Sequence, residues 1–325
     1  MRKSRISVAL ICLKMAVTIA AFYFIARVVD PRKLWVSAKA TRPQYLLMAL
    51  AIAIVQVPIV GVRWHRIVAI LSANGAIVPD TLKIQQIAWI SQFFSQVLPF
   101  AFADATRMIL LRNAGSTLRV AVKSALLDRA VALLVVLLMA LPAVLLSPLI
   151  AGAPAYSTPI RILVAAGLTG SVGAVLVAPT LARVLAGSRL APIFEVLIDL
   201  RRIASNASAL VTVGGLCLLV HLISMVAFWL LAMGQRLPVG LSDAAAIVPL
   251  LVLVATVPVA VAGWGLREAF LLALLSAAGV AGEKALLLSM SFGSVFLVAS
   301  LPGVAAIPFV DRVFVARGEA PESSN

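Results

Sequence analysis

VLPFAFADATRMILLRNAG, residues 97–115, is the stretch that decides how this chain folds. It follows an apolar run, and Pro99 interrupts the helix that the run begins, because proline lacks a backbone N–H and its ring clashes with the preceding turn. Asp104 and Arg107 follow soon after the break. Charged side chains at membrane depth are costly and rare. An acid and a base beside a helix break therefore predict a polar site within the membrane.

The composition of the whole chain predicts an all-α polytopic membrane protein. Of the 325 residues, 63% are hydrophobic and 12% are charged, and this charged share is about half that of a typical soluble domain. The mean hydropathy is +1.11. Apolar runs of about 20 residues, the length of a membrane-spanning helix, recur along the chain. A β-barrel would instead show alternating segments of about ten residues.

The apolar runs predict one integral-membrane domain over residues 1–316, followed by a polar tail at residues 317–325. About six full spans are expected, at residues 7–29, 43–71, 119–147, 160–183, 209–233 and 284–310. Two further segments are broken near their middle: 81–114 at Pro99, and 243–279 at Pro258, Gly263 and Gly265. A break at membrane depth is tolerated only where protein or a watery cavity partners the freed backbone groups. Each broken segment is therefore expected to form a re-entrant helical hairpin or a broken pair of spans.

Basic residues in the loops predict the orientation of the bundle. The basic N-terminus, the loop at residues 72–80 that follows Arg66, the loop at residues 184–208 and the C-terminus would lie inside. One loop disagrees and would place four cations outside: Arg32, Lys33, Lys39 and Arg42. We expect a multi-pass protein of the bacterial cytoplasmic membrane with both termini in the cytoplasm. The net charge of +15 is expected to reflect orientation and anionic lipid headgroups rather than nucleic-acid binding.

The loop at residues 184–208 is the only sizeable connection between the predicted spans. Its apolar and basic residues are compatible with an amphipathic helix that lies on the membrane surface. An ordinary juxtamembrane linker is the alternative, and the sequence leaves both open.

The two interrupted segments share a pattern of apolar helix, proline, small residues, arginine, apolar helix and glycine. The predicted full spans between them are odd in number, which reverses the side from which the second segment enters. This arrangement is typical of an inverted-topology repeat, with a binding site near the midplane between broken helices. Short Pro/Gly patterns also recur by chance in membrane proteins, so repeat and coincidence both stay open.

The residues at the two breaks suit an anion. A half-helix that begins inside the membrane presents unpaired N–H groups and a partial positive charge, both of which favour phosphate. Arg107 and Arg267 would each grip a phosphodiester with two hydrogen bonds. Asp104 shares a helix face with Arg107 and would neutralise it in the empty site. Glu268 is adjacent to Arg267 and points away from it, so these two are expected to pair with other elements.

A purely structural role competes with each of these functions. Asp104 would only cap the positive end of its half-helix, and Arg107 would extend to the headgroups at the membrane surface. Asp128 and Arg129 lie well inside a span and must face the bundle or a cavity. There they would either join the site or form a structural ion pair.

No arrangement of residues points to catalysis: the chain has no P-loop, no phosphate-binding GxGxxG and no nucleophile beside a base. Cys12 and Cys217 lie in separate apolar runs, and His65 and His221 are far apart, so neither a metal site nor a disulfide framework is expected. We therefore expect no cofactor, and a non-enzymatic role is favoured over an enzymatic one.

A series of short motifs runs through the chain in this order: Arg63-Trp64, Leu98-Pro99, Ala103-Asp104, Arg107, Asp128-Arg129, and Pro258 with Gly263, Gly265, Arg267 and Glu268. Together they resemble the lysylphosphatidylglycerol synthase transmembrane-region family, the flippase-like membrane part of the bacterial multiple peptide resistance factor. The resemblance covers residues 40–310. Ala103 replaces the family's usual Gly, and Asp104 replaces its usual Glu. The soluble aminoacyl-transferase domain of the full factor has no counterpart here, so the chain is not expected to make lysyl-lipid.

The resemblance implies movement of a lipid across the cytoplasmic membrane. The first hypothesis is thus a flippase-like lipid translocase for a phospholipid or another anionic or isoprenoid lipid. The residues expected to bind the headgroup are Arg107, Arg267, Asp104, Glu268, Asp128 and Arg129. Two alternatives stay open: a transferase acting on a lipid-linked substrate, and a non-transporting partner of a lipid-modifying enzyme. Membrane lipids are the expected partners, with a lipid-synthesis enzyme or further copies of the chain as additional candidates.

Overall fold

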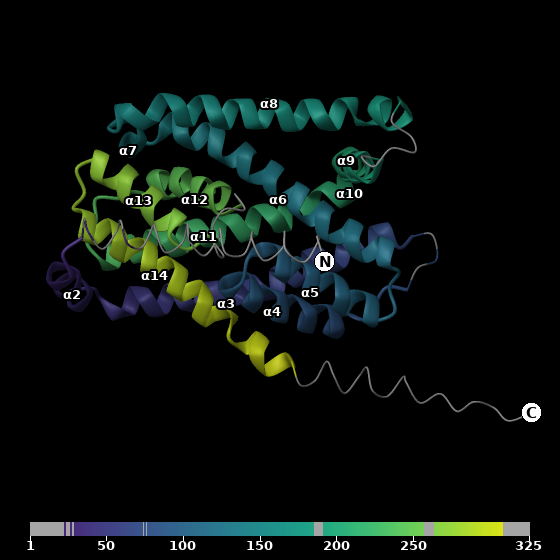
Figure 1. The fold of residues 1–325 in the computed structure, drawn as a ribbon, viewed down its shortest axis with the longest axis horizontal. Coiled ribbons are helices and arrows are strands. Elements are labelled where there is room, and N and C mark those ends of the chain that lie inside the picture. The colour runs from purple at the N-terminus through teal and green to yellow at the C-terminus, as the bar shows by residue number, and fades with distance from the viewer. Residues whose placement is uncertain are drawn as a thin grey trace, which may run out of the picture.

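The computed structural model describes Tyr23, Arg27 and residues 29–73, 75, 77–184, 191–256 and 263–307. Within these residues every regular element is a helix (Figure 1). The prediction of an all-α polytopic membrane protein is confirmed. The expected first span, the polar tail and the predicted break at Pro258 lie outside the described residues, apart from Tyr23, Arg27 and Val29 of that span.

Five helical segments are long and apolar enough to cross a membrane. They are α3 (Pro43–Leu71), α6 (Leu118–Leu146), α8 (Pro154–Val184), the continuous segment Ala207–Gly234 made of α10 (Ala207–Ala209), η1 (Leu210–Gly214) and α11 (Gly215–Gly234), and Gly282–Ile307, which begins with α14 (Gly282–Ser300). Each coincides with a predicted span, and only α8 begins clearly earlier than expected. Hydropathy and length locate these helices well because lipid, rather than a specific partner, covers much of their surface.

The first interrupted segment forms a broken helix pair, as predicted. Its two helices are α4 (Thr81–Val97) and α5 (Phe100–Asn113). Between them, Leu98 and Pro99 adopt ψ angles of 159° and 138°, so the backbone is extended at the break. Because Pro99 cannot donate a backbone hydrogen bond, the helix cannot run through this point.

The second interrupted segment is also broken, into α12 (Leu241–Thr256) and α13 (Leu266–Ala277). Gly263 and Gly265 precede α13 with φ angles of 76° and 85°. These angles lie in the left-handed region, which a side chain disfavours, so glycine is required to start α13 at this angle.

The loops collect at two opposite ends of the bundle (Figure 1). We call the end that carries α9 (Ala191–Ser205) the α9 end, and the end that carries α2 (Pro31–Lys39) and α7 (Pro148–Ala151) the α7 end. Ser116, which follows α5, donates a 2.8 Å hydrogen bond to the carbonyl of Ile77, which precedes α4. The α4–α5 pair therefore enters and leaves the bundle at the α9 end.

The α12–α13 pair begins at the α7 end. Buried Asp243 of α12 accepts hydrogen bonds there from the Ser147 hydroxyl (2.7 Å), the Leu149 amide (3.1 Å) and the Gly240 amide (2.9 Å). The two broken pairs thus enter from opposite ends, as an inverted repeat requires. The repeat itself stays a prediction.

The cations that disagree with the predicted orientation lie on or beside α2. Arg32, Lys33 and Lys39 belong to this short helix, and Arg42 is the N-cap of α3. Trp35 is 63% exposed, and the Lys39 ammonium lies 5.1 Å from the centre of its ring. A short amphipathic helix with basic and aromatic residues suits the membrane interface, where anionic headgroups meet the cations.

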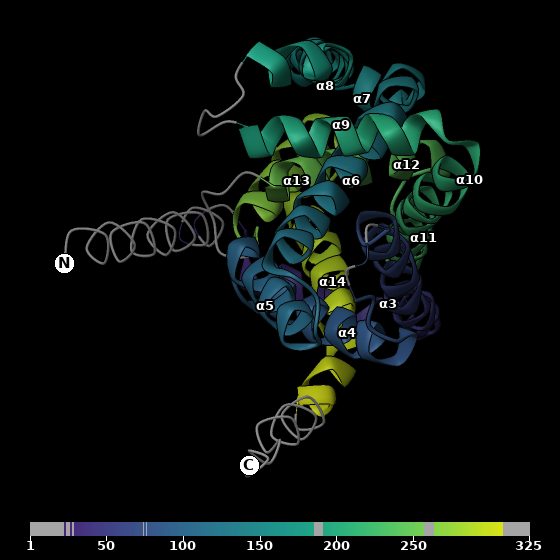
Figure 2. The ribbon, with the colours of Figure 1, turned by 90° about the vertical axis from the view of Figure 1, so that its right-hand side faces the viewer.

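The loop at residues 184–208 contains a helix, α9, which lies between α8 and the start of α6 (Figure 2). Its buried side chains Val196, Leu200 and Ile203 pack onto the bundle rather than onto lipid. At its exposed edge, Arg119 donates a 2.8 Å hydrogen bond to Glu195. This hydrogen bond is the main reason that the pKa of Glu195 is lowered. The helix is therefore docked to α6 by both apolar contact and charge.

Candidate functional site

Asp128 of α6 binds two arginines from two other helices inside the bundle. One carboxylate oxygen lies 2.9 Å from Arg63 of α3, and the other lies 2.9 Å from Arg107 of α5. All three side chains are no more than 7% exposed. Since α6 begins at Leu118, Asp128 lies about 15 Å along the helix at the standard rise per residue. The ion pairs are thus deep within a segment that can cross the membrane.

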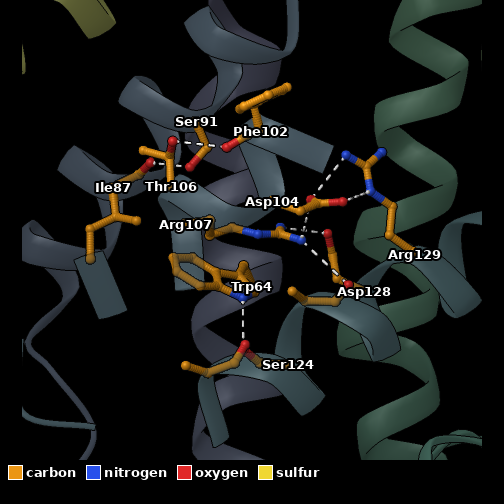
Figure 3. Close-up of polar contacts among 12 residues, drawn as sticks. Trp64, Ile87, Ser91, Phe102, Asp104, Thr106, Arg107, Ser124, Asp128 and Arg129 are labelled. Carbon is orange, nitrogen blue, oxygen red and sulfur yellow. Dashed lines mark hydrogen bonds and ion pairs between the residues drawn. The ribbon is translucent and has the colours of Figure 1, made fainter. Parts of the chain in front are cut away.

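Asp104 extends this chain of ion pairs (Figure 3). One of its oxygens lies 3.3 Å from Arg107, and both oxygens accept hydrogen bonds from the guanidinium of Arg129, at 3.1 and 3.2 Å. The residues therefore alternate in sign, in the order Arg63, Asp128, Arg107, Asp104 and Arg129. We call these five residues the arginine–aspartate network.

The network holds three guanidinium groups and two carboxylates, so the charges of its five side chains sum to +1. The structure agrees with neither of the two purely structural roles considered for Asp104 and Arg107. The N-cap residue of α5 is Pro99, and no side chain caps this helix, so Asp104 is not a cap. Arg107 is 7% exposed and pairs with two aspartates instead of extending to the membrane surface.

Trp64 holds the Arg107 side chain in place. The Arg107 guanidinium lies 5.1 Å from the centre of the Trp64 ring, within the range of a cation–π contact. The fully buried Trp64 donates a 3.3 Å hydrogen bond to the hydroxyl of Ser124, and Arg107 donates one of 3.4 Å to the Ala125 carbonyl. Arg63 and Trp64 of α3 thus provide one of the two arginines paired with Asp128 and the ring that packs against Arg107.

Arg267 and Glu268 pair with each other, so the expectation that they would pair with other elements is wrong. Arg267 donates two hydrogen bonds to one Glu268 oxygen, at 2.6 and 3.0 Å. The Ser289 hydroxyl donates to the same oxygen, and the Gly265 amide donates to the other at 2.6 Å. Glu268 folds back to cap the start of α13, which brings its carboxylate within reach of its neighbour's long side chain. The Arg267 guanidinium also lies 4.6 Å from the centre of the Trp264 ring.

Gly293 of α14 leaves the space that Arg267 occupies, because a Cβ at this position would collide with the guanidinium and with Trp264. We expect Gly293→Ala to displace Arg267 and to lower the free energy of unfolding by about 1–3 kcal/mol, as overpacking does. Thermal unfolding in detergent measures the loss. Gly170→Ala is the matched control, because a Cβ there meets nothing within 4 Å. Equal midpoints for the two variants would contradict the close contact.

The two hairpin breaks meet inside the bundle. The Trp264 indole, beside the second break, donates a 3.0 Å hydrogen bond to the carbonyl of Gln96, beside the first. Next to this contact is a cavity of about 250 Å³, whose wall includes Arg63, Asp104, Arg107, Asp128 and Arg129. A second cavity of about 160 Å³ shares part of that wall and reaches Arg267. The cavities bring together all the predicted headgroup residues except Glu268, which stands behind Arg267.

Several cavity residues were not predicted from the sequence. They are Arg63, noted there only as part of a motif, and the uncharged polar residues Gln56, Ser91, Gln92, Ser95, Gln96, His221, Ser224 and Thr256. A signal was available for α4, because Ser91, Gln92, Ser95 and Gln96 recur at helical spacing within an otherwise apolar stretch. Polar residues on one face of a membrane-embedded helix indicate a face turned away from lipid.

Comparison with known proteins supports the resemblance drawn from the motifs. Among the described residues, no group of three or more His, Cys, Asp and Glu side chains lies close enough to hold a metal ion. A search of curated proteins gave no match. The family model described as "Lysylphosphatidylglycerol synthase TM region" matches residues 11–303, which include the whole arginine–aspartate network. The chain therefore belongs to the lysylphosphatidylglycerol synthase transmembrane-region family, whose members are multi-pass membrane proteins linked to lipid modification or translocation.

Proposed function

We propose that this chain is a flippase-like translocase that moves phosphate-bearing lipids across the bacterial cytoplasmic membrane. The observation that carries the proposal is the position of the arginine–aspartate network, whose five side chains sum to a charge of +1, on the wall of a polar cavity. Ionisable side chains at membrane depth are rare and usually face a cavity that carries the function. An anionic headgroup suits the sign of this charge, and the cavity offers it a place.

Arg107 is the residue best placed to bind the phosphate. It contacts both aspartates of the network, yet each aspartate has another arginine: Asp128 keeps Arg63, and Asp104 keeps Arg129. Arg107 can therefore turn to a phosphate without leaving a buried carboxylate unpaired, which would be strongly unfavourable. A guanidinium suits this role because its planar fork matches two phosphate oxygens.

The arrangement of the broken helices supports a path from one side to the other. One pair enters from the α9 end and the other from the α7 end, and their breaks meet at the Trp264–Gln96 contact. The adjoining cavities connect the network with Arg267. Arg129 lines the first cavity and its side chain is 42% exposed, so in our proposal the headgroup enters the cavity beside this residue. In our proposal the headgroup crosses through the cavities while the acyl tails stay in lipid.

The proposed orientation places the α9 end in the cytoplasm. It follows the basic residues on either side of the loop at residues 72–80, Arg66 and Lys83, those around the start of α6 and those in the loop at residues 184–208. The cations of α2 would then lie at the outer surface, close to the headgroups of the outer leaflet. A lipid-synthesis enzyme as a partner remains part of this proposal.

Reconstitution in liposomes tests the proposed function. Tail-labelled phosphatidate and phosphatidylcholine would be incorporated with the wild-type chain, and outer-leaflet label would be destroyed with a membrane-impermeant reductant. We expect label to be lost from both leaflets for phosphatidate, and slower inner-leaflet loss for the zwitterionic lipid. Protein-free liposomes give the baseline. Inner-leaflet loss no faster than this baseline for either lipid would refute the proposal.

A further inference from the structure

Two hollows lie on opposite faces of α2, where this short helix packs against α14. The first, which we call the apolar hollow, has a volume of about 360 Å³, and its wall includes Leu34, Trp35, Leu46, Leu287 and Met290. The second, which we call the basic hollow, has a volume of about 400 Å³, and its wall includes Arg32, Lys33, Glu283 and Lys284. Neither hollow shares a residue with the two polar cavities of the bundle.

The apolar hollow opens toward the outside of the bundle. Trp35 is 63% exposed, and Leu46 of α3 and Met290 of α14 are also exposed. Because α3 and α14 belong to segments that can cross a membrane, the surroundings of these side chains are lipid rather than water. A hollow of this kind suits an acyl chain, since apolar side chains line most of its wall.

The basic hollow carries a net positive charge. Arg32, Lys33 and Lys284 are exposed, and within the part of the chain that the structure describes none of them forms an ion pair. Glu283 is the acid on the same wall, so the four side chains sum to +2. Arg32 and Lys33 are also two of the cations that disagree with the predicted orientation. An anionic ligand at this end of the bundle would give these cations a function.

We propose that α2 and α14 form a second lipid site, separate from the translocation cavities, that holds an anionic phospholipid in the leaflet at the α7 end. The phosphate lies in the basic hollow beside Lys33 and Lys284, and an acyl chain lies in the apolar hollow beside Trp35. A membrane lipid fits better than a soluble anion, because only the lipid has a charged end for one hollow and an apolar end for the other. Tryptophan suits the boundary between them, since its ring is amphipathic and favours the level of the headgroups.

Photo-cross-linking of the full chain in lipid nanodiscs tests this site. Phosphatidylglycerol and phosphatidylcholine would carry the same photoreactive group in one acyl chain, and labelled peptides would be identified by mass spectrometry after digestion with pepsin. We expect peptides of α2 and of the start of α14 to be labelled about tenfold more by phosphatidylglycerol, because each cation near a membrane surface strengthens the attraction of an anionic lipid. Equal labelling of these peptides by the two lipids would overturn the inference.

The double substitution Lys33→Gln with Lys284→Gln assigns the preference to the basic hollow, because it brings the charge of this wall to zero. Both side chains are exposed, so the variant should fold, and its α2 peptides should be labelled equally by the two lipids. Arg42→Gln with Arg236→Gln is the matched control. These two exposed arginines lie at the same end, where the Arg42 amide donates to the Gly234 carbonyl, and they line neither hollow. An equal loss of preference in the control would indicate diffuse attraction to a basic surface and would overturn the site.

Arg107→Gln separates this site from the proposed translocation path. Arg107 lines the first polar cavity and neither hollow, so this substitution should leave the labelling of the α2 peptides unchanged. A parallel fall in their labelling would contradict the independence of the second site. Failure of the leaflet assay with the labelling intact would refute only the proposed function.

Discussion

Asp128→Asn is expected to lower the free energy of unfolding by about 3–5 kcal/mol, the range measured when one partner of a buried ion pair is removed. The substitution preserves the shape of the side chain and removes its charge. Arg63 and Arg107 would then keep their positive charges inside the membrane-spanning part of the bundle without the carboxylate that lies 2.9 Å from each of them. Whole domains are stable by only about 5–15 kcal/mol, so this loss would remove a large part of the stability of the protein.

Reversible unfolding of the purified protein in mixed detergent micelles measures this loss. Asp80→Asn is the matched control: Asp80 is exposed and caps the start of α4 by accepting a hydrogen bond from the Lys83 amide. Asparagine caps a helix about as well as aspartate, so the control should change stability by only a few tenths of a kcal/mol. A wild-type unfolding free energy for Asp128→Asn would show that Asp128 does not neutralise the two arginines.

Arg107→Gln is expected to have the opposite profile, with small effects on folding and a large effect on lipid movement. The remaining network would contain two complete ion pairs, Arg63 with Asp128 and Arg129 with Asp104, and no surplus charge. Translocation of phosphatidate should fall about 30-fold or more, equivalent to about 2 kcal/mol for the loss of a charge-assisted contact. The leaflet assay described above measures the rate.

Arg66→Gln is the control for this second substitution. Arg66 lies on α3 close to Arg63 in sequence, but it is exposed and does not line either cavity. The two variants therefore change the net charge of the protein equally, and only one changes the charge of the network. If both variants move phosphatidate at the wild-type rate, Arg107 is not the phosphate ligand.

The positions of the helices could be predicted from the sequence because a bilayer imposes a length and a composition on every span. The position of the first helix break could be predicted equally well, since Pro99 cannot continue a helix. The docking of α9 was left open. Its buried Val196, Leu200 and Ile203 would look the same in sequence whether they met lipid or protein.

The charged residues of the site were predicted, and so was the pairing of Asp104 with Arg107. The partners of Asp128 and Arg129 were not. Asp104, Arg107, Asp128 and Arg129 attracted attention because charge is rare in such segments. Which arginine meets which aspartate depends on how α3, α5 and α6 pack, and the sequence does not reveal that packing. For this reason Arg63 was noted only as part of a motif.

The pairing of Arg267 with Glu268 shows a different limit of sequence reasoning. Helical geometry turns adjacent residues about 100° apart, which argued against a pair. At the first turn of α13, however, Glu268 bends back to the Gly265 amide, and the Arg267 side chain reaches it there. Local capping therefore overrode the regular spacing.

Binding of an anionic headgroup by the network is tested by the preference of the purified chain for phosphatidylglycerol over phosphatidylcholine, measured as the charge of the network is changed. Three forms would be compared: wild type with one surplus positive charge, Arg129→Gln with none, and Arg129→Glu with one surplus negative charge. We expect the preference to fall at each step by about tenfold, or about 1.4 kcal/mol per charge. The same preference in all three forms, or an equal fall in the exposed-site variant Arg66→Glu, would contradict it.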